Sequence, residues 1–351
     1  MSPAERTYGF GIIGTGVVAH IHAMAIAAIP QARLKAVYNV SKDKADAFAA
    51  RHGCASFGTI GDLTSDPGID IVCICTPSGA HLEAALACIR AGKHCLIEKP
   101  LEVTPERCDA IIEAAEKAGV KLGVIFNSRF HDAAMQLRQS VEEGRFGEMV
   151  FGDAYVKWHR TPAYYASSAW RGTWALDGGG ALMNQGIHSV DLLQWFMGPV
   201  KSVKAFAANR LHRNIQAEDT VSAVLEFANG ALGNIAASTA VYPGALKQIE
   251  ISGTEGTAIL RENRLIEWSF LHKKESDDMI LQASSELSVS HGGVSDPADI
   301  SYLGHQRQIE DMIRSVRTGV SPFVDGVEGR KSVAIVCAVY ESARTGRMVF
   351  V

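Results

Sequence analysis

The sequence predicts an α/β fold in two domains. A doubly wound parallel sheet comes first, and an α+β domain with a large, open, mixed or antiparallel sheet follows. Short apolar runs alternate with helical patterns up to about Asn127, and longer extended segments follow one another after it. The length of 351 residues exceeds one average core, which favours two domains, 1–127 and 128–351.

The first half predicts strands and helices in strict alternation, as expected for a parallel sheet. The expected strands are Gly9–Ile13, Leu34–Tyr38, Ile71–Thr76, His94–Ile97 and Lys121–Phe126. The expected helices between them are Val17–Ile29, Lys42–His52, Ala80–Ala91 and Pro105–Ala118. Gly53, Gly92 and Gly119 follow three of these helices, where glycine commonly ends a helix.

The second half predicts a sheet with little helix between its strands. The expected strands are Met149–Trp158, Val200–Asn209, Thr220–Phe227, Ala231–Ala240 and Lys247–Ile251, with a hairpin-like turn at 228–230. Two helical patterns, Gln306–Thr318 and Val327–Arg344, end the chain, and we expect one of them to return to the first domain or to pack on the sheet. The segment Glu275–Asp299, rich in Ser and Asp, is expected to be a loop.

Composition excludes several classes of partner. The formal charge is −4 and no basic block could neutralise a run of phosphates, so nucleic acid is not expected as a partner. The amino terminus has no signal-peptide pattern, and no apolar run reaches the roughly 18 residues of a membrane span, which predicts a cytoplasmic protein without a membrane partner. Seven scattered cysteines form no Cys-x-x-Cys or Cys/His cluster, so we expect free thiols and no metal site.

A glycine-rich turn directly follows the first expected strand and opens a helix. It reads Gly14-Thr15-Gly16-Val17-Val18-Ala19. The first glycine permits a tight turn, the second lets the backbone approach a pyrophosphate, and the small Ala19 lets the helix pack closely on the strand. The unpaired N–H groups at the helix terminus then meet the phosphates. The motif predicts dinucleotide binding in a Rossmann domain.

The end of the second expected strand bears on the choice between NADP and NAD. Asn39 stands where NAD enzymes typically carry an acidic residue, and it has no charge to repel a 2′-phosphate. Ser41, Lys42 and Lys44 follow and could contact that phosphate, which favours NADP over NAD. The alternative is that these residues only cap and solubilise the next helix, with Asp43 offsetting the positive charge.

Two further segments follow strands of the same sheet. Thr76-Pro77-Ser78 and His81 are expected to line the ligand crevice, although a proline turn entering a helix explains them nearly as well. Glu98-Lys99-Pro100 places a lysine at the carboxyl end of a strand, where open parallel sheets bind ligands. This position predicts proton chemistry beside a cofactor, and the alternative is a surface lysine in a turn.

The second domain contributes Trp170-Arg171 and a segment with three consecutive glycines, 178–180. If the chain is helical from about Leu182, then Asn184, His188 and Asp191 lie on one face. A lone histidine on such a helix is usually structural, but its polar neighbours favour a ridge that faces a ligand. The glycines are expected to let the backbone approach a bulky group such as the nicotinamide or the substrate.

Together these motifs resemble the Gfo/Idh/MocA oxidoreductases, which include glucose–fructose oxidoreductase and inositol dehydrogenase. The resemblance extends over nearly the whole chain and includes Asn127 with Arg129 and Glu328-Gly329-Arg330 before the last helix. It implies an NAD(P)-binding Rossmann domain, followed by a domain whose open sheet mediates homodimers or homotetramers. It also implies that Lys99 and His188 flank the reacting carbon of the substrate.

The resemblance implies hydride transfer between NADP(H) or NAD(H) and a secondary alcohol or ketone of a sugar, sugar acid or cyclitol. Many members carry Asp where this chain has Asn184, and because an amide cannot accept a proton, proton transfer then depends on Lys99 or His188. Two alternatives exist among relatives: an NAD-dependent glycosidase-like enzyme and a regulator that binds nucleotide without turnover. The further contacts expected for cofactor or substrate are Glu98, Asn127, Trp170, Arg171, Tyr242 and His305.

Overall fold

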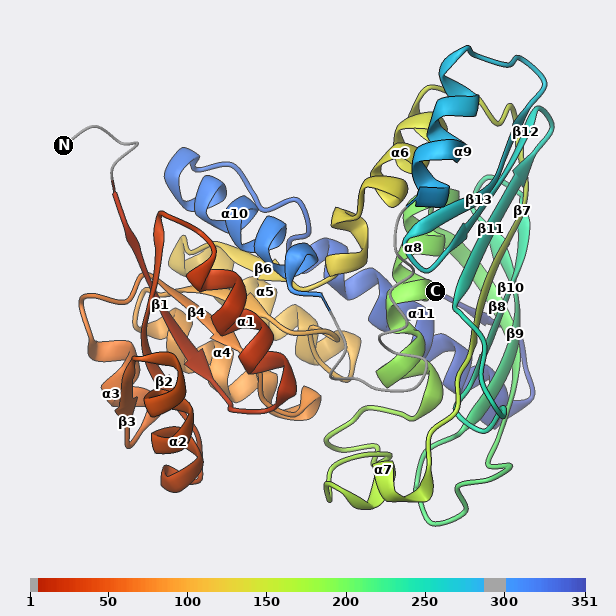
Figure 1. Ribbon diagram of the computed structural model, residues 1–351. Coiled ribbons are helices and arrows are strands. Elements are labelled where there is room, and N and C mark those ends of the chain that lie inside the picture. Colours follow the sequence, from red (N-terminus) through yellow and green to blue (C-terminus); the bar gives the residue numbers. More distant parts are fainter. Residues whose placement is uncertain (1–5, 287–300) are drawn as a thin grey trace. The chain divides into compact units, whose positions relative to one another are not determined.

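The computed structural model describes residues 6–286 and 301–351 and divides into two compact units (Figure 1). The first unit contains 6–127 and Ser301–Arg330, and the second contains 128–286 and Lys331–Val351. The expected second domain, 128–351, differs from this division at Ser301–Arg330. These residues carry helix α10 (Leu303–Thr318), which packs on helix α1 (Val17–Ala27). A segment distant in sequence therefore completes the first unit.

The first unit is built on a six-stranded sheet in the order β3-β2-β1-β4-β5-β6, in which every pairing is parallel. This confirms the predicted parallel sheet, whose chain order reverses between β1 and β4. Only β3 was not expected, because three residues are too few to show a periodic pattern. The strands are β1 Tyr8–Ile13, β2 Ala32–Tyr38, β3 Ala55–Phe57, β4 Ile71–Ile74, β5 His94–Ile97 and β6 Leu122–Val124.

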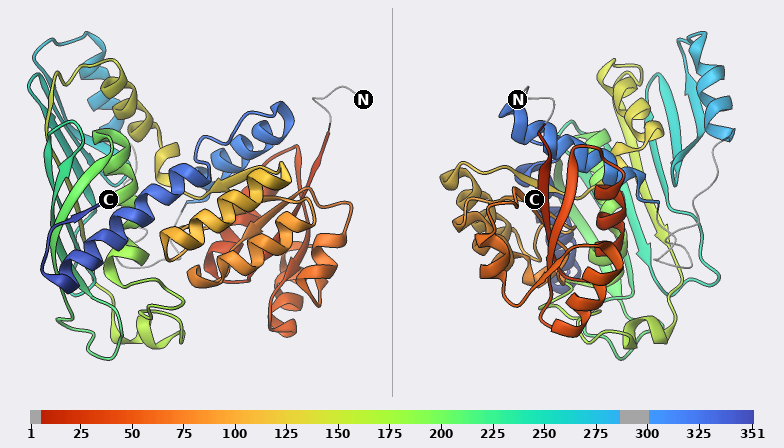
Figure 2. Two further views of the ribbon diagram at one scale, coloured as in Figure 1. Left: turned by 180° about the vertical axis from the view of Figure 1, so that it is seen from behind. Right: turned by 60° about the vertical axis from the view of Figure 1, so that its left-hand side comes forward.

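Helices cover both faces of this sheet (Figures 1 and 2). Gly53 and Gly119 end helices α2 and α5 in the left-handed conformation, with φ of 68° and 67°. Helix α3 was not expected, since its six residues give no periodic signal. The elements besides α1 and α10 are α2 Lys42–His52, α3 Ile60–Ser65, the short η1 Ser78–Ala80, α4 His81–Arg90, α5 Pro105–Ala118 and η2 Asn127–Phe130.

The core of the first unit explains why its central strands are recognisable in the sequence. β1 is buried along its whole length, with Phe10 and Ile12 in the core. Strands covered on both faces appear as continuous apolar runs. Ile309 and Met312 of α10 belong to the same core, and burying each of them stabilises the attachment of α10 by about 1.5 to 3 kcal/mol.

The second unit is built on an eight-stranded mixed sheet in the order β13-β12-β11-β7-β10-β9-β8-β14. Strands β7 and β10 are parallel and all other neighbours are antiparallel, which confirms the predicted mixed sheet. β12 and β13 were missed, because the polar run 261–264 at their turn hides the apolar alternation. The strands are β7 Met149–Lys157, β8 Val200–Ala208, β9 Thr220–Phe227, β10 Leu232–Ser238, β11 Gln248–Gly253, β12 Gly256–Arg261, β13 Arg264–Phe270 and β14 Val349–Phe350.

One face of this sheet is covered by helices (Figures 1 and 2). Gly152 of β7 permits the close approach of α8, since a Cβ at this position would lie 2.6 Å from Met197. The strand registers place Phe206, Val224 and Leu232 together on the other face, where each is more than half exposed. The helices are α6 Asp132–Glu142, α7 Pro162–Ala166, the π-helical turn η3 Ala181–Gly186, α8 Ile187–Met197 and α11 Gly326–Thr345.

Helix α9 (Ser276–Glu286) corrects the prediction of a loop over Glu275–Asp299. Buried Asp277 holds the start of this helix: it accepts hydrogen bonds from Arg145 Nη1 and from Trp268 Nε1, at 2.8 and 2.9 Å. Acidic residues in the first turn favour a helix, although their polarity is also typical of a loop. Residues 287–299 of that prediction lie outside the described residues.

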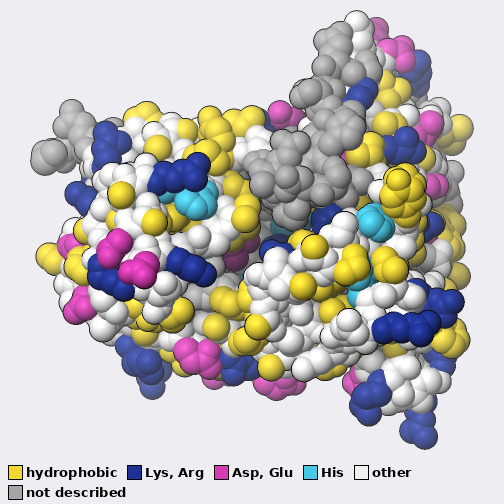
Figure 3. Space-filling view, turned by 60° about the horizontal axis from the view of Figure 1, so that its bottom comes forward, with side chains coloured by type: hydrophobic (Ala, Val, Ile, Leu, Met, Phe, Trp, Pro, Cys, Tyr) yellow, Lys and Arg dark blue, Asp and Glu magenta, His cyan; other side chains and the backbone are white. Residues whose placement is uncertain are grey.

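Three features of the described residues relate to the partners predicted from composition: helix hydropathy, cysteine state and surface charge. Between residues 6 and 286 and from 301 onward, the structure contains no helix with the length and apolarity needed to span a bilayer. All seven cysteines are free thiols, as predicted, and five of them are buried. On the face drawn in Figure 3, acidic and basic side chains are interspersed.

Candidate functional site

The carboxyl ends of the parallel strands bring the predicted cofactor residues to one edge of the first sheet. Backbone hydrogen bonds join neighbouring turns there, from Gly14 N to Tyr38 O at 2.8 Å and from Glu98 N to Ile74 O at 3.0 Å. The edge includes the point where the chain order reverses, the usual ligand site of such sheets. The predicted residues that follow β1, β2, β4, β5 and β6 are Gly14, Asn39, Thr76, Lys99 and Asn127.

The two glycines of the turn after β1 have different roles. Gly14 has a φ of +103°, and a Cβ there would lie 2.4 Å from the carbonyl oxygen of Cys75, so the packing of two turns requires this glycine. Among residues 6–286 and 301–351, no atom besides those of its chain neighbours lies within 4 Å of a Cβ placed at Gly16, and no side chain caps α1 at this residue. The open space at the start of α1 therefore suits a phosphate group, next to the exposed Val17 and partly exposed Val18.

Asn39 connects the end of β2 with the glycine-rich turn. Its Nδ2 donates to Thr15 Oγ1 at 2.7 Å, and its Oδ1 accepts the backbone N–H of Ser41 at 2.8 Å. Lys42 forms an ion pair with Asp46, while Lys44 is exposed. One of the two predicted phosphate-binding lysines is thus already paired with a carboxylate.

The turn after β4 contains an unsatisfied polar atom. Thr76 Oγ1 is buried and has no hydrogen-bond partner among residues 6–286 and 301–351. A polar group of a bound cofactor would satisfy it. Pro77 is partly exposed and Ser78 is buried. The imidazole of His81 lies 2.9 Å from the carbonyl oxygen of Pro100 and 3.1 Å from that of Thr76, so its buried ring joins two turns.

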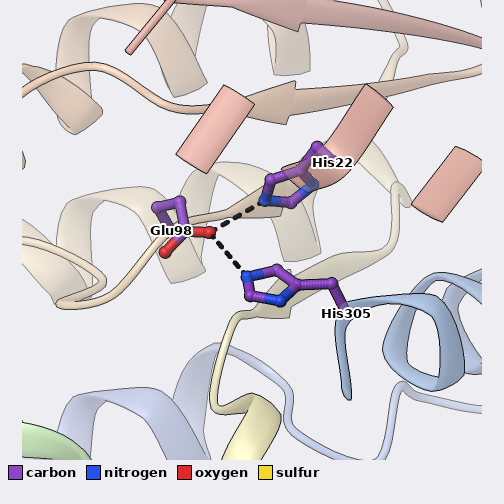
Figure 4. Close-up of side chains that lie close together, drawn as sticks. All are labelled: His22, Glu98 and His305. Carbon is purple, nitrogen blue, oxygen red and sulfur yellow. Dashed lines mark hydrogen bonds and ion pairs between the residues drawn. The ribbon is translucent and has the colours of Figure 1, made fainter. Parts of the chain in front are cut away.

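Lys99 is the second residue after β5, and the side chain of the preceding residue holds its backbone. Glu98 is 5% exposed, and its Oε2 accepts the backbone N–H of Lys99 at 3.2 Å. Its Oε1 lies 2.8 Å from His22 Nε2 and 3.3 Å from His305 Nε2 (Figure 4). His22 comes from α1 and His305 from α10, so two helices fix the carboxylate that holds Lys99.

The charge state of this cluster follows from its contacts. Burial disfavours the ionised form of Glu98, but hydrogen bonds and charge from the two imidazoles hold its pKa well below the usual range. Burial lowers the pKa of His22. The three groups also offer metal-ligand atoms within 4.8 Å of one another. Both imidazoles contact the same carboxylate oxygen of Glu98.

In the second unit, two of the three consecutive glycines pack against protein, where the sequence predicts an approach to nicotinamide or substrate. A Cβ at Gly180 would lie 1.8 Å from the backbone oxygen of Glu218, and a Cβ at Gly179 would lie 2.2 Å from the hydroxyl of Tyr340. Because Gly179 and Gly180 have no side chain, Tyr340 and Glu218 can pack closely against the backbone at the start of the π-helical turn η3. Single π-helical turns are frequent at functional sites, and this one carries Asn184.

Asn184 belongs to a network of hydrogen bonds within the second unit. Its Nδ2 donates to Asp177 Oδ1, and its Oδ1 accepts from Gln185 Nε2 at 2.7 Å. The same Nε2 donates to the hydroxyl of Tyr164 at 2.8 Å, and Arg160 donates to Gln185 Oε1 at 2.8 Å. These bonds fix the orientation of the Asn184 amide.

The three polar residues of the predicted ridge differ in exposure, and Asp191 is not on an exposed ridge. Asn184 and His188 are both partly exposed. Asp191 is 0% exposed and accepts from Arg129 Nε at 2.8 Å and from Nη2 at 2.7 Å. The physical reason is that the guanidinium of Arg129 is itself buried, and a buried cation requires a paired carboxylate.

The remaining predicted contacts lie in three places. Tyr242 is 82% exposed, with its ring 5.4 Å from the ring of His159. The Arg171 guanidinium lies 4.0 Å from the Tyr164 ring and 5.6 Å from that of Trp170. In the first unit, Asn127 Nδ2 lies 3.5 Å from Nδ1 of His305.

Sequence reasoning missed the groups that support these side chains. Glu218 accepts the N–H groups of Gly180 and Leu182 at 3.0 and 2.8 Å, and the hydroxyl of Tyr340 at 3.0 Å. Burial raises the pKa of Glu218 to about 7 despite these bonds. The acidic pair 218–219 directly before a strand is a signal for it, as is a histidine within apolar α1 for His22. No local signal identifies Tyr340.

Two family descriptions match most of the chain. "Oxidoreductase family, NAD-binding Rossmann fold" matches residues 8–126. "GFO/IDH/MocA C-terminal domain" matches residues 134–259. The two matches fall in the two units that the structure separates, and each agrees with the sheet found there.

Individual relatives match over nearly their whole length. Inositol 2-dehydrogenase of Rhizobium meliloti (strain 1021) is 28% identical over 353 residues, covering 98% of this chain and 99% of that protein. Myo-inositol 2-dehydrogenase of Thermotoga maritima is 29% identical over 344 residues and 97% of each chain. A crystal structure of the WlbA dehydrogenase from Bordetella pertussis, in complex with NADH and UDP-GlcNAcA, has a TM-score of 0.90 and 34% identity, covering 99% of this chain and 98% of that one.

Proposed function

Because this chain belongs to the Gfo/Idh/MocA oxidoreductase family, we propose that it transfers a hydride between a nicotinamide dinucleotide and a secondary alcohol or ketone of a sugar, sugar acid or cyclitol. The observation that carries this proposal is the open glycine-rich turn at the switch point of the first sheet, with Lys99 two strands away at the same edge. The names of the relatives, inositol dehydrogenases and a WlbA dehydrogenase crystallised with NADH, support the same class of reaction.

The residues at this edge fit a dinucleotide. The backbone of Gly14, Thr15 and Gly16 borders open space at the start of α1, where a pyrophosphate would bind. The buried hydroxyl of Thr76, in the turn after β4, has no hydrogen-bond partner among the described residues and could bond to a polar group of the dinucleotide. A bound nicotinamide would supply the site that accepts or donates the hydride.

Lys99 is the proposed general base or acid. Its amine takes the proton of the substrate hydroxyl during oxidation and returns it during reduction. Glu98 holds its backbone through the N–H bond at 3.2 Å. His188 and Asn184 are the proposed contacts of the substrate hydroxyl. The amide of Asn184 moves no proton, because it has no titratable group near neutral pH, so it orients the hydroxyl.

NADP(H) is the proposed preferred cofactor over NAD(H). The support is the uncharged Asn39 at the end of β2, followed by Ser41, Lys42 and the exposed Lys44. Opposing it, the pairing of Lys42 with Asp46 weakens the attraction of this side chain for a 2′-phosphate. The proposed preference for NADP(H) therefore depends on two residues. Asn39 places no negative charge near the 2′-phosphate, and Lys44 supplies a positive charge to bind it.

A homodimer or homotetramer is also proposed. The uncovered face of the second sheet carries the exposed apolar residues Phe206, Val224 and Leu232. Exposed apolar patches of this kind are common at protein interfaces. Substituting Leu232→Glu should lower the molar mass measured by light scattering, and an unchanged mass would place the interface elsewhere.

The experiment for the proposed function is a panel of sugars, sugar acids, inositols and their keto forms, assayed with NADP(H) and NAD(H) by absorbance of the reduced cofactor. Lys99→Met should lower kcat at least about 100-fold while cofactor affinity is retained. Lys117→Met, an exposed lysine on α5, is the matched control. Unchanged turnover in Lys99→Met removes this residue from the mechanism. Release of an aglycone from glycosides would instead indicate the glycosidase-like reaction.

A further inference from the structure

A cavity of about 550 Å³ lies within the second unit, lined by two segments, 162–173 and 211–216. Its size is within the range of roughly 300 to 1,000 Å³ that is typical of small-molecule sites. Most of its lining is not used by the proposed hydride transfer, and only Arg171 was expected to contact a ligand.

The charged side chains that line the cavity are all potential cations. They are Arg171, His212 and Arg213, and no Asp or Glu is among the lining residues that the structure describes. Two carboxylates are bonded to the backbone of lining residues. Asp177 accepts the N–H group of Gly172 at 2.8 Å, and Asp219 accepts the N–H group of His212 at 2.8 Å. The cavity is therefore electropositive and suits an anion.

Two of these side chains, those of His212 and Arg213, have polar atoms without a hydrogen bond or ion pair in the part of the chain that the structure describes. His212 is 5% exposed and its Nε2 makes no hydrogen bond. The side chain of Arg213 is exposed and has no ion pair there. Arg171, in contrast, is held in place by the carbonyl oxygen of Tyr164 at 2.9 Å and by Ser167 Oγ at 2.8 Å. A preorganised guanidinium beside an unsatisfied imidazole favours binding of oxygen-rich anions.

The cavity also has apolar walls and a connection to Asn184. Tyr165, Leu211 and Ile215 line it, so it can hold a ring as well as a charged group. The backbone of Tyr164 accepts from Arg171, and its hydroxyl accepts from Gln185, which also donates to Asn184. An anion bound at Arg171 would thus lie next to the network that orients Asn184.

We propose that this cavity binds the phosphate, diphosphate or carboxylate group of a sugar derivative. The anionic group can belong to the substrate itself, in which case the inference rests on the proposed function, or to a separate ligand. In both cases the recognition is a charge-assisted hydrogen bond from Arg171 and Arg213 to anionic oxygens.

Binding is tested by titrating inorganic pyrophosphate, by calorimetry, into the full-length protein saturated with NADPH, so that the dinucleotide site is occupied. Arg213→Gln should weaken binding at least about 10-fold, which corresponds to about 1.4 kcal/mol. Arg210→Gln, an exposed arginine outside the cavity lining, is the matched control and should change affinity less than about twofold. Absence of binding, or equal weakening by both substitutions, overturns the proposal.

Kinetics then distinguish the two sources of the anion. If the substrate carries it, Arg213→Gln raises KM for acidic or phosphorylated sugars and leaves KM for neutral polyols unchanged. If a separate ligand carries it, pyrophosphate alters turnover of neutral polyols by the wild-type protein and not by Arg213→Gln. A protein without dehydrogenase activity would refute the proposed function, and the titration would still test the cavity.

Discussion

The hydroxyl of Tyr340 donates a hydrogen bond of 3.0 Å to the buried carboxylate of Glu218. The same carboxylate accepts the backbone N–H groups of Gly180 and Leu182, at the start of the π-helical turn that carries Asn184. A titratable group thus holds the backbone of a proposed substrate-binding residue, although it lies far from Asn184 in the sequence.

The first prediction concerns the pH dependence of stability. Because burial raises the pKa of Glu218 from 4.5 to about 7, the folded state prefers the protonated group. The difference in pKa contributes on the order of 3 kcal/mol to the free energy of unfolding. This contribution is fully present below the pKa of Glu218 in the unfolded chain, and it is lost as pH rises towards about 7. Urea unfolding at a series of pH values should show this loss in the wild type but not in Glu218→Gln.

The matched control for this experiment is Glu341→Gln, an exposed carboxylate next to Tyr340 on α11. It should keep the wild-type slope of unfolding free energy against pH. If Glu218→Gln keeps that slope as well, then Glu218 is ionised in the folded protein at all pH values above its ordinary pKa.

The second prediction concerns the buried pair of Arg129 and Asp191. Removing one partner leaves an uncompensated charge, so Asp191→Leu should lower the free energy of unfolding by about 3 to 5 kcal/mol. The double substitution Arg129→Met with Asp191→Leu should recover part of this loss. A double-mutant cycle by urea unfolding measures the coupling, and strictly additive effects would contradict a buried ion pair.

The third prediction separates two glycines of one motif. Gly14→Ala should destabilise the first unit by roughly 3 kcal/mol, because it combines a positive φ with a Cβ 2.4 Å from a backbone oxygen. Gly16→Ala should cost less than about 1 kcal/mol, since its Cβ enters open space, but it should weaken NADPH binding about 10-fold. Thermal unfolding and fluorescence titration check both, and equal loss of stability in the two variants would refute the assignment.

The fourth prediction concerns cofactor choice. Asn39→Asp places a carboxylate where it repels a 2′-phosphate and accepts bonds from ribose hydroxyls. The ratio of NADPH to NADH affinity should fall at least about 10-fold. Dissociation constants for both cofactors check this, and an unchanged ratio would show that Asn39 does not face the ribose.

Much of the fold was predictable from local pattern. The strands β1, β4 and β5 are continuous apolar runs, and the helices between them end at glycines, so their order already indicated a parallel sheet. The segment that starts at Ser276 is a helix, although its polar composition predicts a loop. There the decisive contact, between Asp277 and Arg145, joins residues distant in sequence.

The sequence by itself determined the glycine-rich turn, the lysine at the end of β5 and the change from a parallel to a mixed sheet, because each depends on neighbouring residues and their periodicity. Only the tertiary structure decided that His22 and His305 share the carboxylate of Glu98, that Asp191 pairs with Arg129, and that Glu218 supports the turn before Asn184. Burial creates these pairings, because polar groups removed from water must find partners, and the chain's folding alone determines which ones are within reach.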